Sequence, residues 1–169
     1  MIQAWDDLNI LREKNQKNPQ WIYRDLYRQL YNPSLHILAY ERLKSKSGNM
    51  TPGSDELTLD GYGTENIQNT IRLLRTEQYQ PNPVRRVYIP KKAKGKYRPL
   101  GVPSPRDKLV QECVRLILEA IYEPGFHENS HGFRPGRSCH TALKSLRRNW
   151  VGTKWAIEAD LTECFDRTS

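Results

Sequence analysis

The chain has 169 residues, which is enough for about one domain. Hydrophobic residues make up 37% of it, below the roughly 45–50% of an average globular chain, so we expect a modest core. The formal net charge of +8 favours a polyanionic partner, and no apolar run is long enough to span a membrane.

The cysteines are three in number and widely spaced, at Cys113, Cys139 and Cys164. This spacing fits neither a disulfide framework nor a zinc site, so a reducing or matrix-like compartment is favoured. Asp6 and Asp7 lie near the N-terminus, which argues against an Arg-rich transit peptide with few acids. If the protein works in an organelle, we expect it to be processed or made there.

The N-terminal third is predicted to be helical, because apolar residues recur every four positions from Ile22 to Leu30. Asn32 and Pro33 predict the N-cap and the first position of a second helix, which continues to about Ser45. Three tyrosines accompany the first apolar stripe. We interpret them as half-buried packing residues, with base stacking as the alternative. They are Tyr23, Tyr27 and Tyr31.

The middle of the chain is predicted to contain a loop, a helix and a hairpin. Glycine and proline punctuate residues 47–63, which predicts the loop, and Thr64 is expected to cap the next helix. Side chains then alternate before a lysine-rich turn and a second extended stretch. This pattern predicts an antiparallel hairpin over residues 84–98.

The last third is predicted to contain two helices and one strand. Residues 106–122 have the apolar spacing of a helix, and a second, shorter helix is expected to begin near Ser138. Residues 154–161 alternate between apolar and polar side chains, which predicts a strand.

Basic residues concentrate in two zones. Between residues 85 and 108 a single acid, Asp107, accompanies nine cations, and alternation is expected to place several cations on one exposed face. Tyr88 and Tyr97 are expected to stack on bases or riboses. A solvated hairpin is the alternative. The nine are Arg85, Arg86, Lys91, Lys92, Lys94, Lys96, Arg98, Arg106 and Lys108.

The second basic zone, residues 129–157, contains no acid at all. Two nearly acid-free zones favour a nucleic acid as the partner over dispersed surface charge. The cations of the second zone are Arg134, Arg137, Lys144, Arg147, Arg148 and Lys154. Four histidines lack the helical spacing of metal ligands, so we interpret them as structural or RNA-proximal and predict no metal site. They are His36, His127, His131 and His140.

Three stretches resemble group II intron reverse transcriptases, the maturase family. PVRRVYIPKKAKGKYRPLGVPSPRDKLVQECVRLILEAIYEPGFHENSHGFRPGRSCHTAL is similar to their fingers region, and GNMTPGSDELTLDG to the block before it. KWAIEADLTECFD resembles the block that carries the first catalytic aspartate of the palm. The resemblance covers roughly residues 33–166. It implies a right-hand fold of fingers and palm, in which the fingers grip template and intron RNA.

The resemblance places individual residues as well. Asp160 matches the first metal-binding aspartate, and Phe165 and Asp166 hold the Phe-Asp position that follows. Four residues match fingers motifs that contact RNA, with Gly132 and Phe133 in the same block: Arg98, Pro99, Arg134 and Arg137.

The family's Tyr-x-Asp-Asp turn, which supplies further carboxylates to a two-metal site, has no match in this sequence. Asp160 is therefore expected to be orphaned, and the chain is not expected to be an enzyme on its own. We predict no cofactor, with Mg²⁺ binding only if a second chain completes the site.

The expected fold is α+β, with helices and a small antiparallel β element equivalent to fingers and an incomplete palm. We expect a helical segment with a linker at 1–62, an RNA-binding fingers region at 63–150, and the first palm strand at 151–169. That strand would lack its sheet neighbours, so neighbouring proteins are expected to cover it.

Three functions stay open. The leading hypothesis is a non-catalytic, RNA-binding remnant in a large RNA–protein assembly, above all the mitochondrial ribosome, bound to rRNA and to no membrane. The alternatives are a splicing factor that stabilises intron RNA, and part of a reverse transcriptase completed in trans. The expected location is the mitochondrion, with a bacterial cytoplasm as the alternative.

Overall fold

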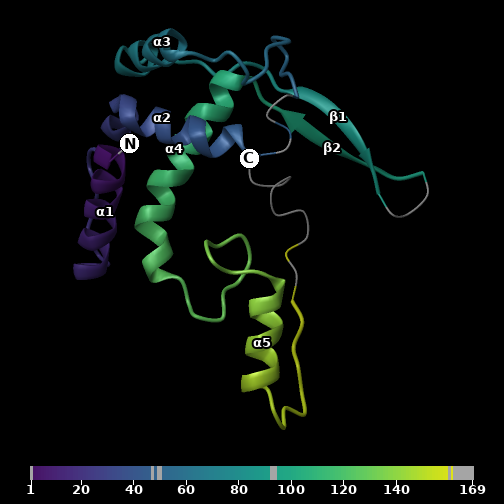
Figure 1. Cartoon of the computed structure of the whole chain (residues 1–169). Coiled ribbons are helices and arrows are strands. Elements are labelled where there is room, and N and C mark those ends of the chain that lie inside the picture. The colour runs from purple at the N-terminus through teal and green to yellow at the C-terminus, as the bar shows by residue number, and fades with distance from the viewer. Residues whose placement is uncertain (1, 47, 49–50, 92–94, 160, 162–169) are drawn as a thin grey trace. The chain divides into compact units, whose positions relative to one another are not determined.

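The structure is a computed structural model that describes residues 2–46, 48, 51–91, 95–159 and 161. It divides into two compact units, residues 1–125 and 126–169. The boundaries expected from the sequence, after residues 62 and 150, do not coincide with this division. Figure 1 labels the helices and strands of both units. Within the described ranges, none of the helices is long and apolar enough to cross a membrane.

The first unit holds most of the secondary structure. Its elements are α1 (Ile2–Lys17), the 3-10 helix η1 (Leu26–Tyr31), α2 (Pro33–Lys44), α3 (Thr64–Arg75), β1 (Arg85–Pro90), β2 (Tyr97–Val102), α4 (Pro105–Tyr122) and the short 3-10 turn η2 (Glu123–Gly125). The observed mixture of helices with one antiparallel pair confirms the α+β class that the sequence predicts.

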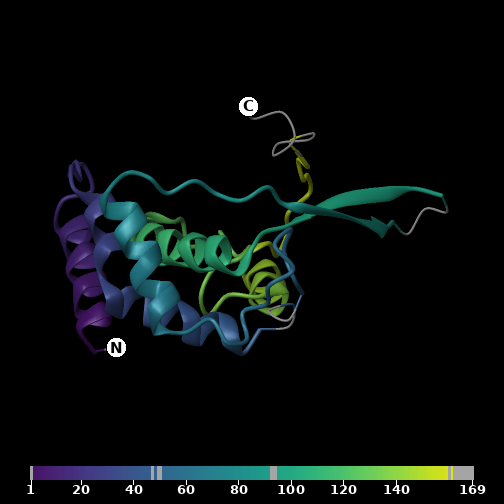
Figure 2. The ribbon, with the colours of Figure 1, turned by 90° about the horizontal axis from the view of Figure 1, so that it is seen from above.

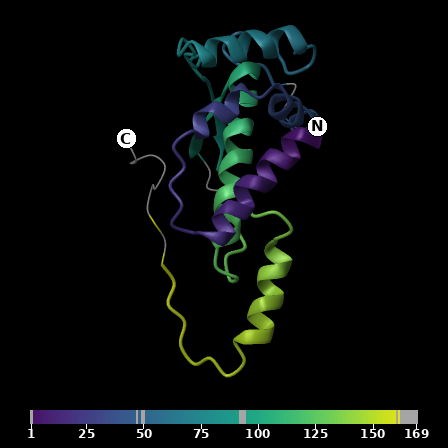
Figure 3. The same ribbon diagram turned by 90° about the vertical axis from the view of Figure 1, so that its left-hand side faces the viewer.

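The core of the first unit lies where α1 and α2 pack against α4, and α3 packs against η1 (Figures 1 and 3). The central helix α4 buries apolar residues at helical spacing, among them Leu109, Cys113, Leu116 and Ile117. Val114, which shares this apolar spacing, lies at the edge of the buried face and is 37% exposed.

Local signals place the helix ends. Asn32 caps α2 by accepting a hydrogen bond from the Ser34 N–H at 2.9 Å, and Pro33 occupies the first helical position, as predicted. Gly63, with an extended backbone, is the N-cap of α3, so Thr64 is its first residue and not its cap. Ser138 caps the last helix through a capping box, which confirms its predicted start.

The predicted helix around Ile22 forms only in part. Residues 21–25 are not helical, and the Ile22 side chain is 77% exposed. Pro19 follows the end of α1 and disfavours continued helix, so the chain resumes only as the 3-10 helix η1. Tyr23 and Tyr31 pack against the core, whereas Tyr27 is exposed. The Tyr23 hydroxyl donates to the Leu11 carbonyl at 2.8 Å. Tyr27 meets Tyr31 edge to face, with ring centroids 5.7 Å apart.

The two strands form the predicted hairpin, which extends away from the helices of its unit (Figure 2). The Lys91 N–H donates to the Lys96 carbonyl at 2.8 Å beyond the last strand pair. Gly95 takes a φ of +77°, a conformation that suits glycine in a tight turn.

The second unit consists of a loop, α5 (Cys139–Asn149) and a C-terminal stretch. The predicted strand at 154–161 is not formed among its described residues, which is a correction. Trp155 is 89% exposed and Ile157 98% exposed. The physical reason is that a strand needs a hydrogen-bonded neighbour, and the described residues pair only β1 with β2.

Candidate nucleic-acid interface

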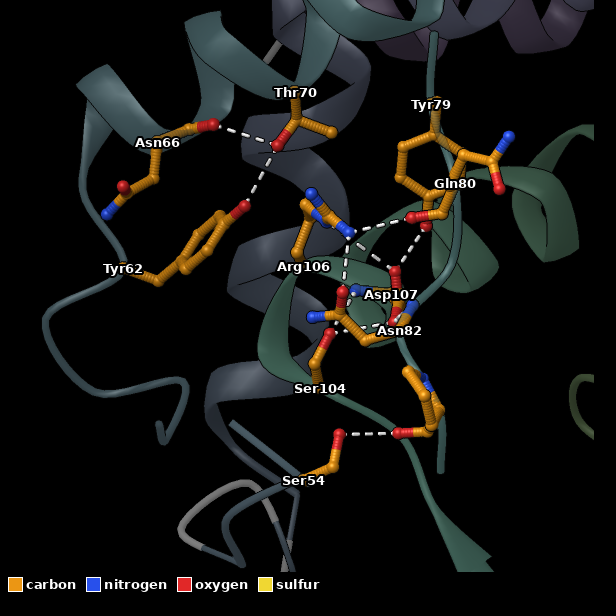
Figure 4. A network of polar contacts seen from close by, with 11 residues as sticks. Ser54, Tyr62, Asn66, Thr70, Tyr79, Gln80, Asn82, Ser104, Arg106 and Asp107 are labelled. Carbon is orange, nitrogen blue, oxygen red and sulfur yellow. Dashed lines mark hydrogen bonds and ion pairs between the residues drawn. The ribbon is translucent and has the colours of Figure 1, made fainter. Parts of the chain in front are cut away.

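The base of the hairpin is held by one buried carboxylate, Asp107, which is 2% exposed at the start of α4. Ser104, the N-cap of α4, donates its hydroxyl proton to Asp107 Oδ2 at 2.8 Å. Tyr79 donates to Oδ1 at 2.5 Å, and the Asn82 N–H donates to Oδ2 at 2.9 Å (Figure 4). These bonds fasten the segment before β1 to the helix after β2.

Arg106 belongs to the same network. Its guanidinium donates to the Gln80 carbonyl at 2.8 Å and to Asn82 Oδ1 at 3.0 Å (Figure 4). It also lies over the Tyr79 ring, 5.3 Å from the centroid. Burial, followed by the hydrogen bond to Asp107, raises the pKa of Tyr79 well above its ordinary value, so Tyr79 stays a donor.

Lys108 has an internal role too. Its ammonium donates to the Thr51 carbonyl at 2.7 Å and to the Gly48 carbonyl at 3.4 Å, and burial lowers its pKa. Arg106 and Lys108, both expected to bind RNA, thus hold the loop and the hairpin's entry against α4. Sequence reasoning missed Tyr79, Asn82 and Ser104 as the partners of Asp107. The Ser104-Pro105 pair was the available signal, because it predicts the start of a helix, and a helix start stabilises a nearby acid such as Asp107.

The remaining cations of the hairpin lie on both of its faces. The cross-strand pairs put Arg86, Tyr88 and Tyr97 on one face. Arg85 and Arg98 lie on the other face with apolar Val87 and Ile89, and Arg98 is the cross-strand partner of Ile89. The expected gathering of several cations on one face is therefore not observed in the strands, because Arg85 and Arg86 are adjacent and point to opposite sides.

The described cations of the strands and turn are exposed, and so are both tyrosines of the hairpin. These cations are Arg85, Arg86, Lys91, Lys96 and Arg98. Lys92 and Lys94 of the turn lie outside the described residues, and so does Asp160. No group of three or more His, Cys, Asp or Glu side chains suited to a metal is found among the residues that are described.

In the second unit, the two arginines of the Gly-Phe-Arg-Pro-Gly-Arg motif hold their own loop. Arg134 donates to the His127 and Ser130 carbonyls at 2.9 and 2.8 Å. Its guanidinium also lies 5.2 Å from the centroid of the Phe126 ring. Arg137 donates to the Glu128 carbonyl at 3.1 Å. The guanidinium of Arg134, expected to grip RNA, is therefore engaged by backbone carbonyls of the loop.

The helix α5 presents the other cations of this unit. It buries none of its residues, and Lys144, Arg147 and Arg148 are all exposed. Lys144 and Arg148 are one helical turn apart and share a face, whereas Arg147 is displaced around the helix. The exposed surfaces on the hairpin and on α5 thus carry most of the predicted RNA-binding residues.

Comparisons with known proteins decide the family. The reverse transcriptase (RNA-dependent DNA polymerase) family matches residues 89–169. The group II intron-encoded protein LtrA of Lactococcus lactis subsp. cremoris is 47% identical over 159 residues, 94% of this chain and 26% of that protein. The chain belongs to the group II intron reverse transcriptase family.

Further relatives extend this family membership. A 91 kDa protein in the cob intron of Schizosaccharomyces pombe is 50% identical over 167 residues, 98% of this chain and 20% of that protein. Nuclear intron maturase 2, mitochondrial, of Arabidopsis thaliana is 46% identical over 65 residues, 38% of this chain and 9% of that protein. The chain spans about a quarter or less of the length of these relatives, and it holds part of a reverse transcriptase domain.

Proposed function

We propose that this chain is the RNA-binding fingers module of a group II intron maturase and that its partner is intron RNA. The observation that carries the proposal is the 47% identity, over 94% of the chain, to a protein named as encoded by a group II intron. A relative that is encoded by an intron, at this level of identity, supports intron RNA as the partner over any other structured RNA.

The exposed hairpin provides the means of binding. Arg86, Tyr88 and Tyr97 offer one cation and two aromatic rings on a single face. Such a face suits an RNA strand, because the rings stack on bases or riboses while the guanidinium meets a phosphate. Lys91 and Lys96, exposed beside the turn, add positive charge, which attracts phosphates independently of sequence.

The relatives named above do not support the ribosomal hypothesis from the sequence. The names of several relatives refer to introns, and none of those given above refers to a ribosome. We therefore place the ribosomal role behind the intron role. A mitochondrial location is likewise a proposal: it is supported by a relative named as mitochondrial, while the Lactococcus relative fits the bacterial alternative.

We also propose that the 169 residues do not polymerise by themselves. The sequence has no Tyr-x-Asp-Asp turn, so it lacks the further carboxylates that a two-metal site requires. Neighbouring protein, from the same or another polypeptide, would cover the exposed Trp155 and Ile157.

The RNA partner is tested by competition between defined RNAs. The 169-residue chain is titrated with a group II intron transcript, a ribosomal RNA fragment of equal length, and scrambled versions of both, at two salt concentrations. We expect the intron transcript to bind at least about tenfold more tightly than the others, roughly 1.4 kcal/mol. Tighter binding of the ribosomal fragment would support the ribosomal hypothesis, and equal binding of all four would leave only non-specific RNA affinity.

A further inference from the structure

A polar pocket of about 300 Å³ lies within the second unit, between the loop at 128–137 and α5. Its lining includes His131 and Arg137 from the loop, and Lys144, Ser145 and Arg148 from the helix. It is unlike the apolar pockets that take drug-like ligands, because nearly every lining side chain ends in a charged or hydrogen-bonding group.

One hydrogen bond joins the two walls of this pocket. The Thr141 hydroxyl donates its only proton to the Ser138 carbonyl at 2.8 Å, so its oxygen is left to accept. It accepts from His131 Nδ1 at 2.9 Å and from the Ser138 N–H at 2.9 Å. The imidazole thereby holds the loop against the first turn of α5, which the Ser138 capping box also orders.

The charges around the pocket are unbalanced. Lys144 and Arg148 are like charges at i and i+4, an arrangement that destabilises a helix unless an anion lies nearby. Within the described part of the chain, neither forms an ion pair. Arg137 adds a third cation, of whose five N–H donors the hydrogen bond to the Glu128 carbonyl uses one. The Glu128 carboxylate is the single acid in the lining.

We infer that this pocket binds one phosphate group of an RNA backbone, with Arg137, Lys144 and Arg148 as its cations. The inference rests on the proposed function for the identity of the RNA. Guanidinium groups match two phosphate oxygens at once, and an ammonium adds a point charge, so three cations around one small hollow suit a phosphodiester. The side chains of Asn129, Ser145 and Asn149 provide neutral donors for the remaining oxygens.

The neighbouring Arg147 provides a matched control. It immediately precedes Arg148 in the sequence and carries the same charge, but it does not line the pocket. It lines a second hollow with His140 and Leu143, and Lys144 borders both hollows. A general attraction between α5 and RNA would depend equally on both arginines. Of these two arginines, a phosphate held in the pocket depends only on Arg148.

The test compares Arg148→Gln, Lys144→Gln and Arg147→Gln in the full 169-residue chain, titrated with a structured RNA at several salt concentrations. We expect the two pocket variants to weaken binding at least about tenfold and to reduce the salt slope by about 0.7–0.9 each. We expect Arg147→Gln to weaken binding by less than about threefold. Circular dichroism of each variant checks that α5 is retained.

The outcomes separate this inference from the proposed function. If the wild-type chain binds RNA and all three variants lose affinity equally, the pocket is not a phosphate site, while the proposed function stands. If the wild-type chain does not bind RNA, both fail. Should a glutamine variant lose helix, Arg148→Lys replaces it: we expect an intermediate loss, because the charge remains and the two-oxygen contact is lost. Unchanged affinity of that variant would also overturn the inference.

Discussion

The backbone N–H of Asn82 donates to the carboxylate of Asp107 over 2.9 Å, although the two residues lie 25 positions apart in the chain. Between them runs the whole hairpin. The same carboxylate accepts from the Ser104 and Tyr79 hydroxyls, so the hairpin leaves and re-enters the helical unit at a single buried point. Asp107, the single acid among the cations of residues 85–108, therefore anchors the hairpin that carries most of them.

Asp107→Asn should destabilise the chain by about 1–3 kcal/mol, the cost of leaving a buried polar group without its partner. An amide has only one accepting oxygen, and its NH₂ faces a donor from Asn82, Ser104 or Tyr79. Urea unfolding at neutral pH measures the change. Glu41→Gln removes the same charge from an exposed site on α2 and should change the stability by no more than about 0.5 kcal/mol. Equal effects of both variants would contradict the anchoring role.

The stability of the chain should fall in mild acid because of His36, which is fully buried. Burial lowers the pKa of His36 below its ordinary 6.5, although its hydrogen bond to the Leu30 carbonyl opposes the shift. Below about pH 6.5 the unfolded chain therefore binds more protons than the folded chain. The free energy of unfolding should decrease as the pH drops from 6.5 toward the folded pKa.

Urea unfolding of His36→Gln between pH 7.5 and pH 5 tests this dependence, because glutamine can donate to Leu30 without titrating. We expect the fall in stability below pH 6.5 to shrink in this variant. His140→Gln, at an exposed histidine of α5, should keep the wild-type fall. An unchanged pH dependence in His36→Gln would assign the effect to other groups.

Replacing Lys91, Lys92, Lys94 and Lys96 together by glutamine should reduce the slope of log K against log salt for RNA binding by about three. Each phosphate contact contributes about 0.7–0.9 to the slope of log K against log salt. All RNAs should be weakened alike, because phosphate contacts carry no sequence information. A control with Lys14, Lys17, Lys44 and Lys46 changed to glutamine removes equal charge away from the hairpin. Equal flattening in both variants would leave no special role for the turn.

Arg134→Lys should loosen the loop of the second unit. Both bonds come from Nη1 of Arg134, and the same planar guanidinium lies over the Phe126 ring. Lysine keeps the charge, but it lacks the planar group that makes these contacts together. Hydrogen–deuterium exchange of peptides from residues 127–138 should rise relative to wild type. Arg147→Lys, on α5, should leave this exchange unchanged. If exchange in the Arg134 variant also stays at the wild-type level, the loop does not depend on that guanidinium.

The isolated 169-residue chain should extend no primer when template, nucleotides and Mg²⁺ are supplied. The physical reason is the missing set of carboxylates for a second metal. Gel analysis of a labelled primer gives the result, with an intact reverse transcriptase as the positive control. Incorporation that Asp160→Asn abolishes would show that these residues assemble a working site.

The local sequence pattern was sufficient to predict most of the helices and strands. The hairpin follows from alternation and a glycine-containing turn, and the starts of α2 and α5 follow from Asn32 and Ser138. Such features depend on backbone hydrogen bonds between near neighbours and on the spacing of apolar residues, both of which are visible along the chain. The family, too, is recognisable from the sequence, because its motifs are long and ordered.

Only the tertiary structure decided which cations face outward. Arg106 bonds to a carbonyl 26 residues away and Lys108 to one 57 residues away, whereas Arg98 stays exposed on the hairpin. The strand predicted at 154–161 failed for the same reason, because its fate depends on a neighbour and not on its own alternation. The sequence determines the chemical type of each side chain. Its partners are determined by folding, because folding brings distant carbonyls and strands within hydrogen-bonding distance.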